Sequence, residues 1–347
     1  MLLAFFGSML GGQAFAETKR KEQSAPVKVA EDYIADRKAV FDALPGWKFR
    51  CKVLGEEQTI EQFGGRIGFM KMMDSLLAEC SRRFQVAGIN DAGGNQIHFF
   101  MTEMVPFSGK SSPHMYDTSG EADPTYDIRL VVNDHSGPDD VAGGWLDVPY
   151  LALGHNYKGI NTPYAVDALV HEFGHTRGVP DLYATRVDAD KNPVNHQAYD
   201  SKTDVMNYPY GVHVWGAYSK MIIDASGGEK INKQHYEFFP EKVSVRVTDS
   251  TGAPVPGAKV NFYPVYPYSY SVTAVPDYKV TTDENGIYTF GRNPFIKKGS
   301  EKVDDNIFNF LVEVIRDGEK QYAWMPIDDA EVAGGKGENY RLEIIWQ

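Results

Sequence analysis

Apolar residues recur at helical spacing in three stretches of the first half of the chain. The first covers residues 30–44 and stops at Pro45-Gly46, and the second covers residues 66–84. The third has Pro163 in its first turn, where proline is tolerated, and stops at Gly178, a residue type that favours helix ends. Each pattern predicts an amphipathic helix with one face in a core.

Short apolar runs between these stretches predict strands. The runs are Trp47–Val53, Ile97–Met104, Tyr126–Val132, Gly143–Leu146 and Tyr150–Leu153. The order of strand, helix, several strands and helix is typical of an α/β or α+β domain.

After Pro240 the helical period gives way to a period of two. Alternating apolar runs lie over residues 243–247, 258–262 and 340–346. Asn285-Gly286 and Asp317-Gly318 are pairs that favour two-residue hairpin turns between strands. We therefore expect an all-β sandwich of about a hundred residues at the end of the chain.

Composition excludes several classes of function. The chain has 347 residues, with 47 acidic against 35 basic side chains and a net charge of −12. A nucleic-acid partner requires a basic surface, which this balance opposes. No run of about 20 apolar residues is present, so we expect no transmembrane segment. Two cysteines are too few for a zinc site made of four thiolates.

The first sixteen residues have the features of a signal peptide. They carry no charged side chain and end in Ala14-Phe15-Ala16, the small-x-small pattern of a cleavage site. We therefore expect a secreted or periplasmic protein, and the alternative is a buried N-terminal helix. Because an exported protein meets an oxidising compartment, Cys51 and Cys80 are candidates for a disulfide, with two free buried thiols as the alternative.

The residues best suited to chemistry lie between His171 and Asp181. On a helix His171 and His175 share one face, so both can bind one metal ion. Glu172 lies beside that ion, where a general base for a metal-activated water belongs. Gly178 ends the helix and lets the chain turn back, which brings Asp181 to the metal as a third ligand and leaves the fourth position open. The alternative is a helix with two solvent-facing histidines and a capping Asp.

This segment resembles the extended H-E-x-x-H-x-x-G-x-x-H/D pattern of the metzincin zinc peptidases, in its Asp variant. The Gly-x-Pro-Asp ending is most similar to bacterial sequences of the snapalysin and immune-inhibitor A type. The resemblance covers residues 46–235 and implies a Zn²⁺ ion held by His171, His175 and Asp181. The strand and helix order predicted above is also that of metzincin catalytic domains.

The resemblance further implies a Met-containing turn beneath the metal, which Asp204–Tyr208 matches. Met206 would lie under the ion, with ordinary core packing as its alternative role. Tyr208, two residues later, would stabilise the oxyanion of the tetrahedral intermediate through its O–H. Gly143–Leu146 would be the edge strand that pairs with an extended substrate, and the alternative is a plain loop. In such a fold the two cysteines are neighbours, which favours their pairing.

The C-terminal part resembles carboxypeptidase-regulatory-like or transthyretin-like sandwiches. Val247–Val260 and Thr282–Phe290 carry this resemblance. Such modules accompany enzymes and carry no catalysis. Four tyrosines between residues 263 and 270 are candidates for a surface that binds glycan or protein, and the alternative is strand and loop packing.

The segment Asp188–Asn195 begins like a calcium-binding loop, which makes Ca²⁺ a second candidate cofactor. It lacks the glycine at the sixth position, and Tyr199 stands at the twelfth position, where an acid is needed. A solvated acidic loop is the alternative that this pattern favours.

Together these features predict an α+β protein with a metzincin-like domain followed by an all-β sandwich. The expected parts are a signal peptide over 1–16, a linker and helix over 17–45, a zinc peptidase domain over 46–238 and a sandwich over 239–347. The predicted function is that of an exported zinc endopeptidase acting on proteins or peptides, with cell-wall or glycoprotein substrates as one possible class. The alternative is a secreted binding or adhesion protein in which the sandwich binds glycan or protein and the zinc site is structural.

Overall fold

The computed structural model describes residues 32–86, 96–108, 125–133, 143–144, 150–153, 160, 162–229, 233–302 and 305–347. The described residues up to Val166, apart from Val86 and Gly144, form one compact unit, and Asp167–Gln347 belong to a second. Residues 32–43 form the first expected helix, whereas the predicted signal peptide lies outside the described residues. No helix in the described part of the chain has the length and apolar character needed to cross a bilayer.

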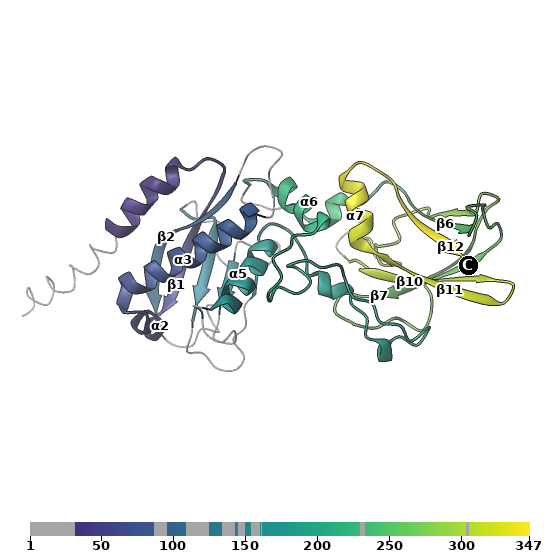
Figure 1. Cartoon of the computed structure of the whole chain (residues 1–347), viewed down its shortest axis with the longest axis horizontal. Helices are drawn as coiled ribbons and strands as arrows, with labels where there is room; N and C mark the ends of the chain where they lie inside the picture. The colour runs from purple at the N-terminus through teal and green to yellow at the C-terminus, as the bar shows by residue number, and fades with distance from the viewer. Residues whose placement is uncertain are drawn as a thin grey trace, which may run out of the picture. The chain divides into compact units, whose positions relative to one another are not determined.

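The first unit is built on a five-stranded sheet (Figure 1). Its strands are β1 (Trp47–Glu56), β2 (Ile97–Phe107), β3 (Ile128–Val132), β4 (Gly143–Gly144) and β5 (Tyr150–Leu153), in the order β2-β1-β3-β5-β4. β1 lies between β2 and β3 and is parallel to both, and β3 is parallel to β5. Gly143 and Gly144, the first two residues of the predicted edge strand, thus form β4 at the edge of the sheet. Its other two residues, Trp145 and Leu146, lie outside the described residues.

Two helices follow β1 directly. α2 (Glu57–Gln62) was not apparent from the apolar pattern; it begins where Glu56 accepts a hydrogen bond from the backbone N–H of Thr59 at 2.8 Å. α3 (Gly65–Val86) is the second expected helix, and it buries a stripe of residues three and four apart. This stripe consists of Phe69, Met70, Met73, Leu76, Leu77, Cys80 and Phe84. Phe84 stacks edge-on against Phe99 of β2, with 5.3 Å between ring centroids, which fixes α3 against the sheet.

Cys51 of β1 and Cys80 of α3 are free thiols, so the structure contains the alternative to the expected disulfide. Both side chains have no exposed surface. Burial raises the pKa of each thiol, which keeps both protonated and unreactive at neutral pH. They act as small apolar residues of this core.

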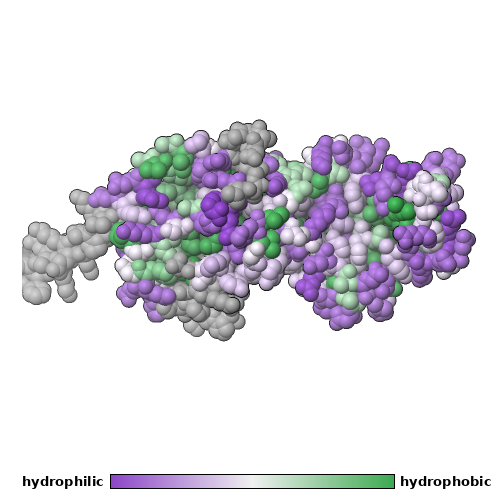
Figure 2. Space-filling model, in the orientation of Figure 1, coloured by the Kyte–Doolittle hydropathy of each residue, from purple (hydrophilic) through white to green (hydrophobic). Residues whose placement is uncertain are grey.

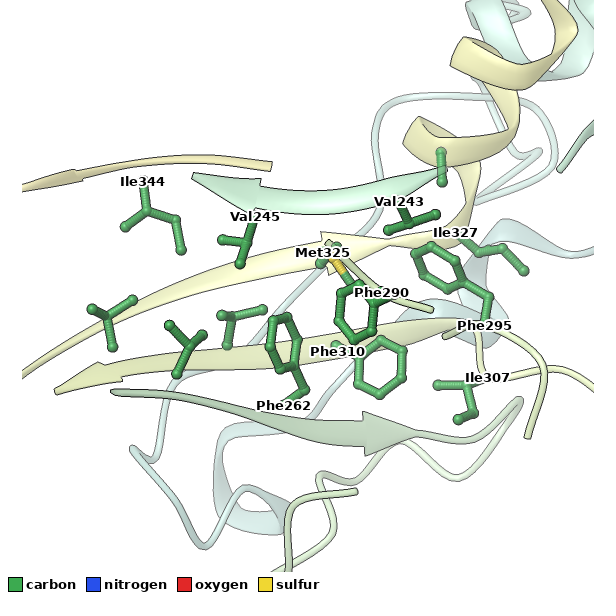
Figure 3. Close-up of a cluster of buried hydrophobic side chains, with 14 of the residues drawn as sticks. Val243, Val245, Phe262, Phe290, Phe295, Ile307, Phe310, Met325, Ile327 and Ile344 are labelled. Carbon is green, nitrogen blue, oxygen red and sulfur yellow. The ribbon is translucent and has the colours of Figure 1, made fainter. Parts of the chain in front are cut away.

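The second unit contains two stacked sheets, as predicted for the end of the chain. The first sheet has the order β11-β10-β7-β8 and the second has the order β12-β6-β9. The strands are β6 (Val243–Asp249), β7 (Lys259–Val265), β8 (Tyr278–Thr281), β9 (Ile287–Thr289), β10 (Asn309–Arg316), β11 (Glu319–Pro326) and β12 (Tyr340–Trp346). Figure 3 shows Phe262 and Phe310 of the first sheet meeting Val243, Val245 and Ile344 of the second in one buried cluster. Hydrophilic residues cover much of the sandwich on the face drawn in Figure 2.

Two details of the sandwich differ from expectation. Asp317-Gly318 forms the predicted two-residue hairpin, with both residues at positive φ and Arg316 paired with Glu319. Asn285-Gly286 also turns the chain, but β8 and β9 pair with different partners in different sheets, so this turn is a crossing between sheets. The sandwich is also not all-β, because α7 (Ile327–Gly335) lies between β11 and β12 and buries Ile327 and Ala330 in the core.

The sandwich core gives a direct test of packing. Val312 of β10 is fully buried, whereas Val275 is 70% exposed. We expect Val312→Ala to lower the free energy of unfolding by about 2 kcal/mol, because it removes two buried methyl groups and leaves a cavity. Val275→Ala makes the same chemical change at the surface and should alter stability by less than about 0.5 kcal/mol. Equal midpoints for the two variants in urea unfolding would contradict this packing.

Candidate metal centre

α5 (Pro163–His175) carries the three residues at the centre of the site. His171, Glu172 and His175 are all buried, and their ligand atoms lie within 4.8 Å of one another. The two imidazole rings are 4.8 Å apart between centroids and nearly perpendicular, as expected for residues four apart on one face. Glu172 Oε2 lies 3.8 Å from His175 Nε2. The carboxylate is therefore beside the point where the imidazole nitrogens converge.

Asp181 completes this group after a sharp turn. Gly178 ends the helical segment with φ +93°, and a Cβ there would lie 2.0 Å from the backbone oxygen of Lys233, so only glycine fits. The turn brings Asp181 Oδ1 to 2.9 Å from His171 Nε2 and 3.3 Å from His175 Nε2. Two ligands of a tetrahedral zinc, each about 2.0 Å from it, lie about 3.3 Å apart. Asp181 Oδ1 is thus within about 0.4 Å of that spacing from each imidazole nitrogen.

Backbone carbonyls fix the orientation of both imidazoles. His171 Nδ1 lies 2.9 Å from the carbonyl oxygen of Val205, and His175 Nδ1 lies 2.8 Å from that of Val179. A carbonyl oxygen only accepts, so each Nδ1 carries the proton and donates. When a ring is neutral, its Nε2 therefore carries the lone pair, which is the tautomer that a metal ligand needs; in a protonated ring Nε2–H can instead donate to Asp181.

The predicted Met-containing turn packs directly under α5. An ideal Cβ on Gly174 would lie 2.5 Å from Met206 Sδ, so the small residue between the two histidines makes room for the methionine. Met206 has no exposed surface. Its backbone oxygen accepts a hydrogen bond from Leu182 N at 2.9 Å, which ties the turn to the residue that follows Asp181.

Asp204 organises this turn, although the sequence had not marked it for a role. Its Oδ1 accepts from the backbone N–H of Met206 at 2.8 Å, an Asx-turn that the Asp-x-Met order makes possible. Its Oδ2 accepts from Gly216 N at 2.7 Å and from the Ser219 hydroxyl at 2.8 Å. Ser219 belongs to α6 (Ala217–Ser226), a helix that the apolar pattern did not predict.

The resemblance gave a role to Tyr208, whereas Tyr268 and Tyr183 are the tyrosines that contact Asp181 and His171. Tyr208 is 60% exposed, and its ring stacks edge-on against Tyr210. Its role at the oxyanion stays a prediction. Tyr268, from the sandwich, donates a hydrogen bond to Asp181 Oδ2 at 2.8 Å. Tyr183 stacks on His171 at 6.2 Å and stands edge-on to Tyr268 at 5.9 Å. The tyrosine-rich run at 263–270 was the only feature of the sequence that pointed toward Tyr268.

Charges in the site are strongly coupled. Burial raises the pKa of Glu172 above its ordinary value, because it removes the water that would solvate the charged carboxylate. Burial also opposes charge on His175, but the hydrogen bond and negative charge of Asp181 outweigh it and raise the pKa of His175 to about 9. In return the two histidines hold the pKa of Asp181 well below its ordinary value, against the effect of burial.

The Asp188–Asn195 loop, the candidate calcium site, forms internal pairs. Asp188 contacts Lys191 Nζ at 2.9 Å and an Arg186 nitrogen at 3.1 Å. Asn192 donates to Asn195 Oδ1 at 2.6 Å and accepts from Val194 N at 3.1 Å. These contacts join residues of the loop and its flanks to one another, and calcium binding stays a prediction.

No protein-family model and no curated protein matches this sequence. Among solved structures, a match is found with the crystal structure of catalytically inactive OgpA from Akkermansia muciniphila in complex with an O-glycopeptide substrate, glycodrosocin. The identity is 11%, the match covers 81% of this chain and 92% of that chain, and the TM-score is 0.34. A TM-score of this size does not indicate a shared fold.

The contact between α5 and the Met206 turn predicts a sensitive position. We expect Gly174→Ala to destabilise the protein by about 1–3 kcal/mol, because its methyl group would overlap Met206 Sδ and press on Trp215, 3.1 Å away. Gly291→Ala is the matched control, since a Cβ at Gly291 meets nothing within 4 Å. Thermal unfolding of both variants measures the difference. Equal unfolding temperatures would show that the turn does not pack against α5 as described.

The coupling of His175 with Asp181 predicts a pH dependence for the metal-free protein. The folded pKa of His175, about 9, exceeds its unfolded value of about 6.5, so its contribution to stability is complete below pH 6.5 and is lost as pH rises through 9. We expect the unfolding temperature in excess chelator to fall over this range. In His175→Gln this fall should be smaller, and identical pH profiles for the two proteins would contradict the coupling.

Proposed function

We propose that this protein is a zinc-dependent endopeptidase. The observation that carries the proposal is the convergence of His171 Nε2, His175 Nε2 and Asp181 Oδ1 at 2.9 and 3.3 Å, with Glu172 buried beside them. Two nitrogens and one carboxylate oxygen suit zinc, and three protein ligands leave one position for water or substrate, as catalytic zinc sites do. The neutral tautomer favoured by the Val179 and Val205 carbonyls supports the same assignment.

Zinc bound here would polarise the scissile carbonyl and make water a better nucleophile near neutral pH. Glu172 would accept the proton of the attacking water and donate it to the leaving amine. Its environment suits both tasks, because burial raises the carboxyl pKa above its ordinary value while its carboxylate oxygen lies 3.8 Å from His175 Nε2. Met206 and the two backbone carbonyls would hold the imidazoles still during the reaction.

The finer parts of the proposal rest on the resemblance to metzincins. Residues 46–238 would form the peptidase domain, and Gly143–Leu146 would be the edge strand to which an extended substrate adds. Tyr208 would assist the oxyanion. The N-terminal sixteen residues would direct export, so that the enzyme acts on proteins or peptides outside the cytoplasm, in a secreted or periplasmic location.

The test removes the proton acceptor and keeps the site's shape. We expect Glu172→Gln to retain bound zinc and to lose proteolytic activity on a denatured protein substrate by about 10²–10⁴-fold, because no other group would take the water proton. Glu284→Gln makes the same change at an exposed position of the sandwich and should leave activity unchanged. The measurements are metal content by elemental analysis and peptide release over time. Equal peptide release by wild type and Glu172→Gln would refute the proposed function.

A further inference from the structure

The loop between β7 and β8, residues 266–277, reaches the metal centre from the sandwich. Tyr268, in this loop, donates a hydrogen bond from its hydroxyl to Asp181 Oδ2, with 2.8 Å between the oxygens. The two residues are 87 positions apart in the sequence. Asp181 Oδ1 faces the two histidines, so the two oxygens of one carboxylate have separate partners. Tyr268 is 51% exposed, whereas Asp181 is 8% exposed. The tyrosine therefore lies at the rim of the site with its hydroxyl directed inward.

Backbone hydrogen bonds hold this loop to the segment that follows Asp181. Tyr268 N donates to Ala184 O at 3.2 Å, Asp188 N donates to Tyr270 O at 3.0 Å, and Val272 N donates to Lys191 O at 3.1 Å. Apolar packing reinforces these bonds, because Val187 shares a buried cluster with Val265 and Val272. The loop and the segment from Ala184 to Lys191 are thus fixed to each other along their length.

The loop also adopts a backbone conformation that tyrosine disfavours. Tyr268 has φ +58° and Tyr270 has φ +54°, in the left-handed region where a Cβ is unfavourable. Such strain persists only when surrounding contacts determine the conformation, and it concentrates at functional sites. At Tyr268 the compensating contacts are the bond to Ala184 O, the hydroxyl bond to Asp181 and the edge-on contact with Tyr183.

We propose that Tyr268 is a positioning residue of the metal centre, and that the sandwich thereby supplies part of the zinc site. The inference rests on the proposed zinc-dependent function. A carboxylate held at one oxygen cannot rotate freely about its Cβ–Cγ bond, so the Tyr268 bond on Oδ2 keeps Oδ1 directed at the imidazole nitrogens. The hydroxyl also partly compensates the buried negative charge of Asp181, at the carboxylate oxygen that does not face the imidazoles.

The test measures zinc affinity and not only catalysis. In Tyr268→Phe the ring and the loop remain, and only the hydroxyl is lost. We expect this variant to bind zinc about 10–100-fold more weakly in competition with a fluorescent chelator, the usual effect of losing a partner of a metal ligand. Tyr270→Phe is the matched control, because Tyr270 lies in the same loop with nearly the same φ, and we expect its zinc affinity to stay within about 2-fold of wild type. The cobalt(II) form of Tyr268→Phe should also show a changed visible absorption spectrum.

A second variant covers the case in which Tyr268→Phe fails to fold. Tyr268→Gly adopts positive φ without strain, so it should fold and show the same loss of zinc affinity. Wild-type zinc affinity in a folded Tyr268 variant would overturn the inference and leave the proposed function standing. Absence of zinc binding by the wild-type protein would instead refute the proposed function itself, so the two failures are distinguishable.

Discussion

The site depends on the contact of the Asp181 carboxylate with the imidazole nitrogens of His171 and His175. A buried carboxylate is costly unless charge and hydrogen bonds compensate it, and here both oxygens are engaged at 2.8–3.3 Å. A turn and two backbone carbonyls hold the carboxylate and the imidazole rings in this arrangement. Gly178 permits the turn that returns Asp181 to the helix, and the carbonyls of Val179 and Val205 orient the rings. Because these contacts come from separate segments, the site forms only when the surrounding chain is folded.

Local patterns in the sequence predicted much of the fold and failed where pairing between distant segments decided the outcome. The stripe of α3 and the Asp317-Gly318 hairpin are determined by residues a few positions apart, so their prediction was correct. Asn285-Gly286 has equally good turn chemistry, yet it joins strands of different sheets. A turn pair specifies the local backbone but not the partners of the strands it joins. α7 escaped prediction because it is short and its buried face follows tertiary packing, with Ile327 and Ala330 in the sandwich core.

The same distinction holds at the metal centre. Helix geometry alone places His171, Glu172 and His175 on neighbouring positions of one helix. Gly178 followed by Asp181 indicates that the chain turns back toward them. The structure brings these residues together. Tyr268 is 87 residues from Asp181, and no periodicity relates the two. Only the density of tyrosines between 263 and 270 marked that region, and it suggested a binding surface. Cys51 and Cys80 show the converse, since their predicted positions on a strand and a helix were correct while the bond between them is absent from the structure.

The packing of the segment after Asp181 bears on what the sandwich contributes. Ala184 belongs to the main sandwich core, and Val187 belongs to a smaller cluster with Tyr263, Val265 and Leu311. These residues follow Asp181 by only three and six places, so the chain passes from the candidate site into the sandwich core almost at once. A module that packs this close to Asp181, and binds its carboxylate through Tyr268, would be coupled energetically to the position of that carboxylate. The sandwich is therefore better understood as a support for Asp181 than as an independent appendage.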